Sequence, residues 1–227
     1  ASADVSYEGY LPNELYTQSG YYGSEGSLKA AISALHDEGI LAIADIVINH
    51  RVGTFDWGDF SNPTWGTDAV CGDDEWPSAT GNADTGSPYG AARDIDHTQG
   101  YVRQSIKDWM GWMQGELGYD GYRFDYAKGF AGGYVGEYVE ATSPAFSVGE
   151  YWDDLDLNNP NAHRQRLANW GNATGGRSAV FDFTTKGILQ QAFSDNSYWR
   201  LQDNQGRPSG LMGWWPSKSV TFLDNHD

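Results

Sequence analysis

The sequence is poor in cysteine, in basic residues and in long apolar runs. Cys71 is the only cysteine among 227 residues, so neither a disulfide framework nor a cysteine-based metal site is expected. Lysine and arginine total 14 against 31 aspartates and glutamates, a net charge of −17. Because such a protein is repelled by phosphate backbones and anionic lipid surfaces, nucleic acid and membranes are not expected partners. The longest apolar run, residues 40–48, contains Asp45 and is too short to span a bilayer.

Two kinds of signature are also missing. The first ten residues have neither the basic nor the apolar region of a signal peptide. No GxGxxG or GxxxxGK[ST] loop follows any apolar run, which removes the main sequence support for a nucleotide-binding fold. What the chain does have is 39% hydrophobic and 15% aromatic residues, which is ample material for a globular core.

Apolar runs typical of buried parallel strands alternate with helical patterns. One helical face covers residues 28–35, with Ser24 as N-cap and Gly39 as the stop; a second covers residues 102–117 and ends at Gly118. A third helix is expected over residues 185–193. The six predicted strands cover residues 7–11, 40–49, 119–126, 145–152, 179–183 and 220–224.

Repeated strand–helix–strand units leave two parallel architectures, a doubly wound sheet and a (β/α)8 TIM barrel. Four strands end in charged or amide clusters, "DIVINH", "YRFDYAK", "SVGEYW" and "FLDNHD", and an active site forms at the carboxyl ends of barrel strands. We therefore predict an α/β fold: a truncated TIM barrel containing strands two to seven. Residues 1–50 and 98–227 form its two parts, and the aperiodic residues 51–97 form an excursion domain after the third barrel strand.

Asp125 is the first candidate catalytic residue. Arg123 lies two residues earlier and points to the same side of the strand, and a neighbouring cation keeps a carboxylate ionised, as a nucleophile requires. The alternative is a structural ion pair inside the barrel.

Glu150 is the second candidate. It ends an apolar strand and precedes Tyr151 and Trp152, and apolar surroundings raise a carboxyl pKa and favour the protonated form of a general acid. The alternative is a solvated glutamate at the start of a loop. One nucleophile and one proton donor on neighbouring strands are the equipment of a retaining glycosidase.

Taken in order, the four strand-end motifs resemble the signature regions of the α-amylase family of retaining glycoside hydrolases, and "GYLPNELY", "FDFTTKGIL" and "GLMGWWPSKSVTF" resemble plant-type members. The resemblance implies that Asp125 is the nucleophile, Glu150 the acid/base and Asp227 the stabiliser of the transition state. It also implies that Lys128 and Trp152 line the leaving-group side. The residues implied to hold the sugar at the cleavage site are His50, Arg123, His226 and, as a stacking platform, Tyr10.

The same resemblance implies a calcium ion that ties the excursion domain to the barrel. Without this resemblance, "GNADTGSPYG" indicates a turn-rich loop with solvated aspartates rather than a metal site. The loop after Arg51 is shorter than in plant-type members, and Pro88 replaces an expected aspartate, so one ion is predicted, with Asp74 as a possible peripheral ligand. The implied ligands are Asn49, Asp84, Asp94 and the carbonyl groups of Ser87 and Gly129.

Trp214 and Trp215 resemble a surface site that binds starch granules in plant-type members. Two adjacent exposed indoles form a flat apolar patch suited to a glucan helix. The alternative is that at least one of them packs into the core.

The predicted function is endo-acting hydrolysis of α-1,4-glucosidic bonds in starch and related glucans, with retention of configuration. The alternatives are a related transglycosylase, branching enzyme or α-glucosidase, and a non-catalytic starch-binding protein. The resemblance further implies a monomer that is secreted to the extracellular space.

Overall fold

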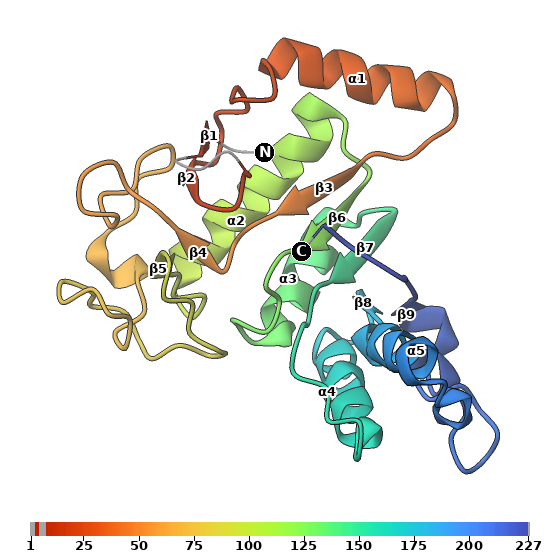
Figure 1. Ribbon diagram of the computed structural model, residues 1–227. Helices are drawn as coiled ribbons and strands as arrows, with labels where there is room; N and C mark the ends of the chain where they lie inside the picture. Colours follow the sequence, from red (N-terminus) through yellow and green to blue (C-terminus); the bar gives the residue numbers. More distant parts are fainter. Residues whose placement is uncertain (1–2, 5–7, 227) are drawn as a thin grey trace.

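The computed structural model describes residues 3–4 and 8–226, and its centre is a five-stranded parallel sheet (Figure 1). Adjacent strands pair in register, with Ile46 opposite Phe124 and Phe124 opposite Gly149. The strands, in their order across the sheet, are β3 (Ile43–Ile46), β6 (Gly121–Phe124), β7 (Phe146–Gly149), β8 (Ala179–Phe181) and β9 (Ser219–Val220).

Strand order distinguishes the two candidate architectures. A doubly wound sheet reverses its order at a switch point, whereas a barrel adds each new strand on the same side of the last one. Here the order follows the chain in one direction from β3 to β9, and the helices pack on each other in the same order, α2 on α3, α3 on α4 and α4 on α5. The described sheet is therefore α/β with barrel-like winding, and its two edges do not pair with each other.

Within the described residues, five α-helices accompany the sheet. The Ser24 hydroxyl accepts a hydrogen bond from the Ser27 N–H, which confirms the predicted N-cap, and Gly39 has a positive φ of 72° after the first helix. The helices are α1 (Glu25–Asp37), α2 (Gly100–Trp112, continued by a π-helical turn at Met113–Leu117), α3 (Gly132–Thr142), α4 (Pro160–Ala173) and α5 (Phe183–Asp195).

Helices α3 and α4 were not predicted. Helix α3 begins with two glycines and contains a third, Gly136, and glycine is a poor helix former. A Cβ atom at Gly136 would lie 2.6 Å from the carbonyl oxygen of Thr174, so this glycine permits the close approach of α3 to the end of α4. The residue that weakens the local helical pattern is thus the one that tertiary packing needs.

The first predicted strand, residues 7–11, is wrong as a member of the parallel sheet. Tyr7 lies outside the described residues, and residues 8–11 form no strand. The short strand β2 (Pro12–Glu14) pairs antiparallel with β1 (Ala3–Asp4) instead. Gly9 has a φ of +89°, which interrupts extended backbone before β2, and Pro12, which lacks an N–H, is the first residue of that strand.

The last predicted strand, residues 220–224, is shorter than expected. Its partner β8 ends at Phe181 because Asp182 is the N-cap of α5 and accepts a hydrogen bond from the Thr185 N–H at 2.9 Å. The Asp182 N–H bonds to the carbonyl of Val220, and beyond that point β9 has no partner strand. Residues 221–226 therefore leave the sheet, and in Figure 1 they run back toward β6.

Residues 51–97 contain little regular structure and lie on the left of Figure 1. Their two ends are joined by an antiparallel pair, β4 (His50–Arg51) with β5 (Arg93–Asp94). The buried Arg51 guanidinium donates to the backbone carbonyls of Asn13 and Pro63, each at 2.9 Å. The segment does not have a separate core, because Phe60, Trp65, Trp76 and Val70 join one hydrophobic cluster with Ile46 and Phe124 of the sheet.

No helix within residues 3–4 and 8–226 is long and apolar enough to cross a membrane.

Candidate active site

Asp125 and Glu150 lie side by side at the carboxyl ends of neighbouring strands. Each directly follows its strand and continues the ladder: the Asp125 N–H donates to the Ile46 carbonyl at 3.0 Å, and the Glu150 N–H donates to the Phe124 carbonyl at 2.9 Å. Both are buried, with exposed fractions of 8% and 7%. The parallel register of β3, β6 and β7 therefore brings together the two carboxyl groups that the strand-end pattern singled out.

A single guanidinium, that of Arg123, contacts both carboxylates. Its Nη1 lies 2.7 Å from Asp125 Oδ1 and its Nη2 contacts Glu150 Oε1. The same Nη1 lies 2.7 Å from Asp45 Oδ1. Burial lowers the pKa of Arg123, but the charges of Asp45 and Glu150 raise it further than burial lowers it, so the guanidinium stays charged.

The pKa of Asp125 is shifted in the direction opposite to the sequence expectation. Arg123 does lower the pKa of this carboxyl, but burial raises it more strongly, and the nearby charges of Glu150 and Asp45 raise it further, to about 7. The surroundings of Glu150 also differ from the expectation, since they are not purely apolar: Glu150 pairs with Arg123 and accepts a hydrogen bond from the Tyr126 N–H at 3.2 Å. The two carboxyls thus compete for one cation.

Asp45 is a member of this cluster that the sequence reasoning missed. It is the direct partner of Arg123 in the β3–β6 ladder, and besides the guanidinium it accepts the hydroxyl proton of Tyr10 at 2.7 Å. The Tyr10 hydroxyl also lies 2.8 Å from His226 Nε2, and the two rings stack with centroids 5.6 Å apart. Because the Tyr10 hydroxyl donates its one hydrogen bond to Asp45, its oxygen accepts a hydrogen bond from the N–H of His226. Only the pairing register of β3 with β6 places Asp45 beside Arg123, and that register is known only from the folded structure.

A pocket of about 420 Å³ opens over these strand ends. Its lining includes six predicted site residues, namely Tyr10, Asp125, Lys128, Glu150, Trp152 and His226. It also includes five that the sequence did not suggest, namely Glu8, Tyr89, Tyr126, Asp153 and Asp154. Trp152 is held by stacking on Phe183, with ring centroids 4.9 Å apart.

Two predicted sugar-binding residues do not line the pocket. Arg123 lies behind the two carboxylates that it pairs with. His50 is only 1% exposed, its Nε2 lies 2.8 Å from the Tyr10 carbonyl, and its ring stacks against Tyr89 with centroids 3.9 Å apart. Asp227, the predicted third carboxylate, lies outside the described residues.

The predicted calcium ligands meet between β4, β5 and the loop after β6. Asn49 Oδ1 and Asp84 Oδ2 are buried and have no hydrogen-bond partner. A Cβ atom at Gly129 would lie 1.9 Å from Asn49 Oδ1, so the two residues are in close contact, and the Ser87 N–H bonds to the Lys128 carbonyl beside them. The Asn49 amide donates to Asp94 Oδ1 at 3.1 Å.

The pKa values of two carboxyls at this place are raised. Burial raises the pKa of Asp94 to about 7, to which the charges of Asp84 and Asp74 also contribute, and burial raises the pKa of Asp84. Both carboxylate oxygens of Asp74 already accept hydrogen bonds, one from the Trp76 N–H and one from the Asp94 N–H. No group of three or more His, Cys, Asp or Glu side chains suited to a metal ion occurs in the described part of the chain, so any ion here also needs amide and backbone oxygens.

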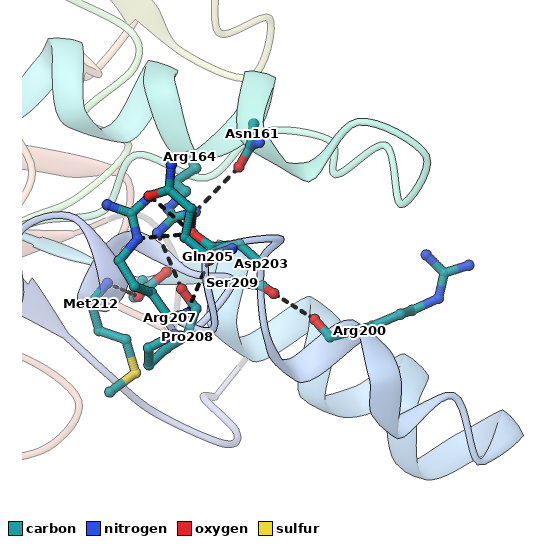
Figure 2. A network of polar contacts seen from close by, with 10 residues as sticks. Asn161, Arg164, Arg200, Asp203, Gln205, Arg207, Pro208, Ser209 and Met212 are labelled. Carbon is teal, nitrogen blue, oxygen red and sulfur yellow. Dashed lines mark hydrogen bonds and ion pairs between the residues drawn. The ribbon is translucent and has the colours of Figure 1, made fainter.

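Trp214 and Trp215 do not form the flat exposed pair that the resemblance implied. Both are half-buried, and neither lines the pocket. The Arg164 guanidinium lies 4.0 Å from the Trp214 ring centroid, and Trp215 packs against Gly171. Figure 2 shows how Arg164 is held: it reaches from α4 to Asp203 and to the Pro208 carbonyl, both in the loop of residues 202–210. Their role in starch binding stays a prediction.

The comparisons with known proteins agree with the motif-based interpretation. No model of a known protein family matches the chain. The chain is 46% identical over 98% of its length to "Alpha-amylase 3, chloroplastic" of Arabidopsis thaliana, of which it covers 26%. It is 45% identical over its whole length to "Probable alpha-amylase 2" of the same plant, of which it covers 57%. An α-amylase structure from Malbranchea cinnamomea matches 97% of the chain at a TM-score of 0.72 and 24% identity, with 46% of that structure covered.

These findings confirm the resemblance to α-amylases, and to plant ones in particular, across the whole chain. The chain spans about a quarter and somewhat more than half of the two curated relatives, respectively. Both relatives are α-amylases by name, which agrees with the predicted enzyme class. The expected extracellular location has no support, since one of these relatives is described as chloroplastic.

Proposed function

We propose that the protein containing this chain hydrolyses internal α-1,4-glucosidic bonds of starch and related glucans with retention of configuration. The observation that carries the proposal is the placement of Asp125 and Glu150. They follow adjacent strands, contact the two terminal nitrogens of the Arg123 guanidinium and line the same pocket. Retaining glycosidases need two carboxyl groups close together, because one attacks the sugar while the other delivers a proton. The similarity to named α-amylases supports the choice of substrate.

In the proposed mechanism the catalytic pair starts with one proton. Burial and, less strongly, the charge of Glu150 raise the pKa of Asp125, and the reaction requires Asp125 in its ionised form and the proton on Glu150. Glu150 donates its proton to the glycosidic oxygen while ionised Asp125 attacks the anomeric carbon, so that the bond to the leaving glucan breaks as the glycosyl–enzyme ester forms. Ionised Glu150 then removes a proton from water, whose oxygen replaces Asp125 at the anomeric carbon. Asp227 stabilises the positive charge of both transition states.

The test is hydrolysis of soluble starch by the full natural protein and by its Asp125→Asn and Glu150→Gln variants. Loss of the acid/base is expected to reduce kcat by about 10²–10⁴-fold, and loss of the nucleophile by at least as much. The anomer released first, followed by NMR, should be the α form. Unchanged activity in Asp125→Asn sinks the mechanism, and glucan products formed without new reducing ends would favour the transglycosylase or branching alternatives.

We further propose that one calcium ion is bound by Asn49, Asp84 and Asp94 and by the carbonyls of Ser87 and Gly129. The donor set fits this ion, because Ca²⁺ takes carboxylate, amide and backbone oxygens, and two of these oxygens, Asn49 Oδ1 and Asp84 Oδ2, are buried without partners. When bound, the ion would supply positive charge that favours the ionised aspartates and would join residues 51–97 to the sheet. Chelation followed by calorimetric titration with Ca²⁺ tests the site, and a stoichiometry of one is expected.

We also propose that the full protein is a monomer. Light scattering on the full natural protein tests it, and a mass of two or more chains would contradict it.

A further inference from the structure

Tyr89 lies in the pocket although no motif points to it. It belongs to the irregular segment of residues 51–97, and it lines the pocket together with Asp125 and Glu150. One ring face of Tyr89 is covered by His50, with ring centroids 3.9 Å apart and planes 10° apart. Because His50 is only 1% exposed and Tyr89 is partly exposed, Tyr89 forms the pocket wall at the place where His50 was expected.

Several contacts hold Tyr89 in this position. Its N–H donates to Asp94 Oδ2 at 2.9 Å, and Asp94 is in turn paired with His50 in the β4–β5 ladder. The ring lies edge-on to Tyr126, with centroids 5.1 Å apart, and the Tyr126 hydroxyl donates to the neighbouring Pro88 carbonyl at 3.0 Å. The ring is thus preorganised by both the excursion segment and the loop after β6.

Tyr89 is placed differently from the tyrosines of the protein core. Tyrosines that serve only the core of this protein are different: Tyr122 and Tyr138 are both completely buried, and each makes its hydroxyl contact within the protein, with the Met110 carbonyl and with His97 respectively. Tyr89 instead presents a partly exposed aromatic ring and a hydrogen-bond donor to the pocket.

We propose that Tyr89 is a substrate-binding residue, whose ring packs against the apolar C–H face of a glucosyl unit next to the cleaved bond. Pyranose rings combine apolar C–H faces with hydroxyl edges, and a fixed aromatic ring beside polar groups is the surface that fits them. Because the ring is already held by His50 and Tyr126, little conformational entropy is lost when the sugar binds. This inference rests on the proposed glucan hydrolysis.

The experiment compares Tyr89→Phe, Tyr89→Leu and Tyr89→Ala in the full natural protein, with Tyr101→Ala as the matched control. Tyr101 is a partly exposed tyrosine of α2 that bonds Asp68 and does not line the pocket. The readouts are kcat and KM on an unbranched α-1,4-glucan oligosaccharide, and Kd by calorimetry with each change placed in a Glu150→Gln background. Tyr89→Leu keeps apolar bulk against His50, so it separates loss of the aromatic face from loss of packing.

Tyr89→Leu and Tyr89→Ala should raise KM and Kd on the order of tenfold, with a smaller fall in kcat, whereas Tyr89→Phe and Tyr101→Ala should stay within about threefold of the parent. Equal Kd for Tyr89→Phe and Tyr89→Leu overturns the inference, as does a fall in kcat with Kd unchanged, which would make Tyr89 only a support for His50. If the parent protein cleaves no α-1,4-glucan, the proposed function itself fails, and the two failures are thereby distinguished.

Discussion

The two acidic clusters of this molecule differ in where their counter-charge comes from. In the first, which we call the arginine cluster, Asp45, Asp125 and Glu150 surround Arg123, and every carboxylate contacts the guanidinium. The cation belongs to the chain and is carried on the same strand as Asp125. The arginine cluster therefore contains its own counter-charge.

In the second, the oxygen cluster of Asn49, Asp84 and Asp94, no side-chain cation contacts either aspartate among the described residues. Two of its oxygens are buried without a partner, and burial raises the pKa of both aspartates. Buried unpaired oxygens cost about 1–3 kcal/mol each. The difference teaches that the arginine cluster carries its own counter-charge beside the pocket, whereas the oxygen cluster has unpaired oxygens that the proposed calcium ion would satisfy.

Removal of Arg123 should have the largest effect. Arg123→Ala leaves three carboxyls close together without their cation, so we expect a loss of about 3–5 kcal/mol in the free energy of unfolding and at least about 10²-fold in kcat/KM. Urea unfolding and starch hydrolysis measure the two quantities. Arg177→Ala breaks the exposed pair with Glu140 and should change stability by less than about 1 kcal/mol. Equal losses in both variants would contradict the role given to Arg123.

Removal of calcium should have the next largest effect. With free calcium at about 100 times its Kd, chelation should lower the free energy of unfolding by about 2.7 kcal/mol. Asp84→Asn should abolish this response, whereas Arg123→Ala should retain it, because the two clusters share no ligand. Thermal unfolding with and without chelator is the measurement, with Asp108→Asn on the exposed side of α2 as the control. A chelator response that survives in Asp84→Asn would remove this aspartate from the site.

The smallest expected effect is on pH dependence. Burial raises the pKa of Asp125 from 3.8 to about 7, so the folded protein holds this proton more tightly than the unfolded chain does. The contribution of Asp125 to stability is then largest below its unfolded pKa and is lost as the pH rises through about 7. Catalysis requires the ionised form, so kcat/KM should rise with pH through the same range.

Asp45→Asn sharpens this prediction. Asp45 raises the pKa of Asp125 and shares Arg123 Nη1 with it, so its removal should move the acidic limb of the pH–kcat/KM profile to lower pH. Asp37→Asn, at the end of α1, should leave the profile unchanged. A shift toward higher pH in Asp45→Asn would contradict the assigned sign.

Much of this arrangement was predictable because it depends on local patterns. Continuous apolar runs identified β3, β6, β7 and β8, and the polar residue following two of them identified Asp125 and Glu150. The cap at Ser24 and the stop at Gly118, which has a φ of +90°, are equally local. These features depend on the chemistry of a few consecutive residues, and the fold did not override it.

Other features were not predictable because they depend on distant partners. Helix α3 is stabilised by a close approach at Gly136, and the indoles of Trp214 and Trp215 are partly covered by Arg164 and Gly171. Tyr89 faces the pocket because Asp94 and His50 hold it there. No local pattern reveals these contacts, since all of them except the Tyr89–Asp94 hydrogen bond join residues far apart in the chain.

The sequence by itself determined the α/β alternation, the resemblance to α-amylases and the identity of the two paired carboxyl residues, because these depend on residue type and short-range order. The tertiary structure alone decided the charge balance among them. Strand register brought Asp45 to Arg123, and burial raised the pKa of Asp125 against the cation that was expected to lower it. Electrostatic energies depend on distance and on exclusion of water, and both are properties of the folded molecule.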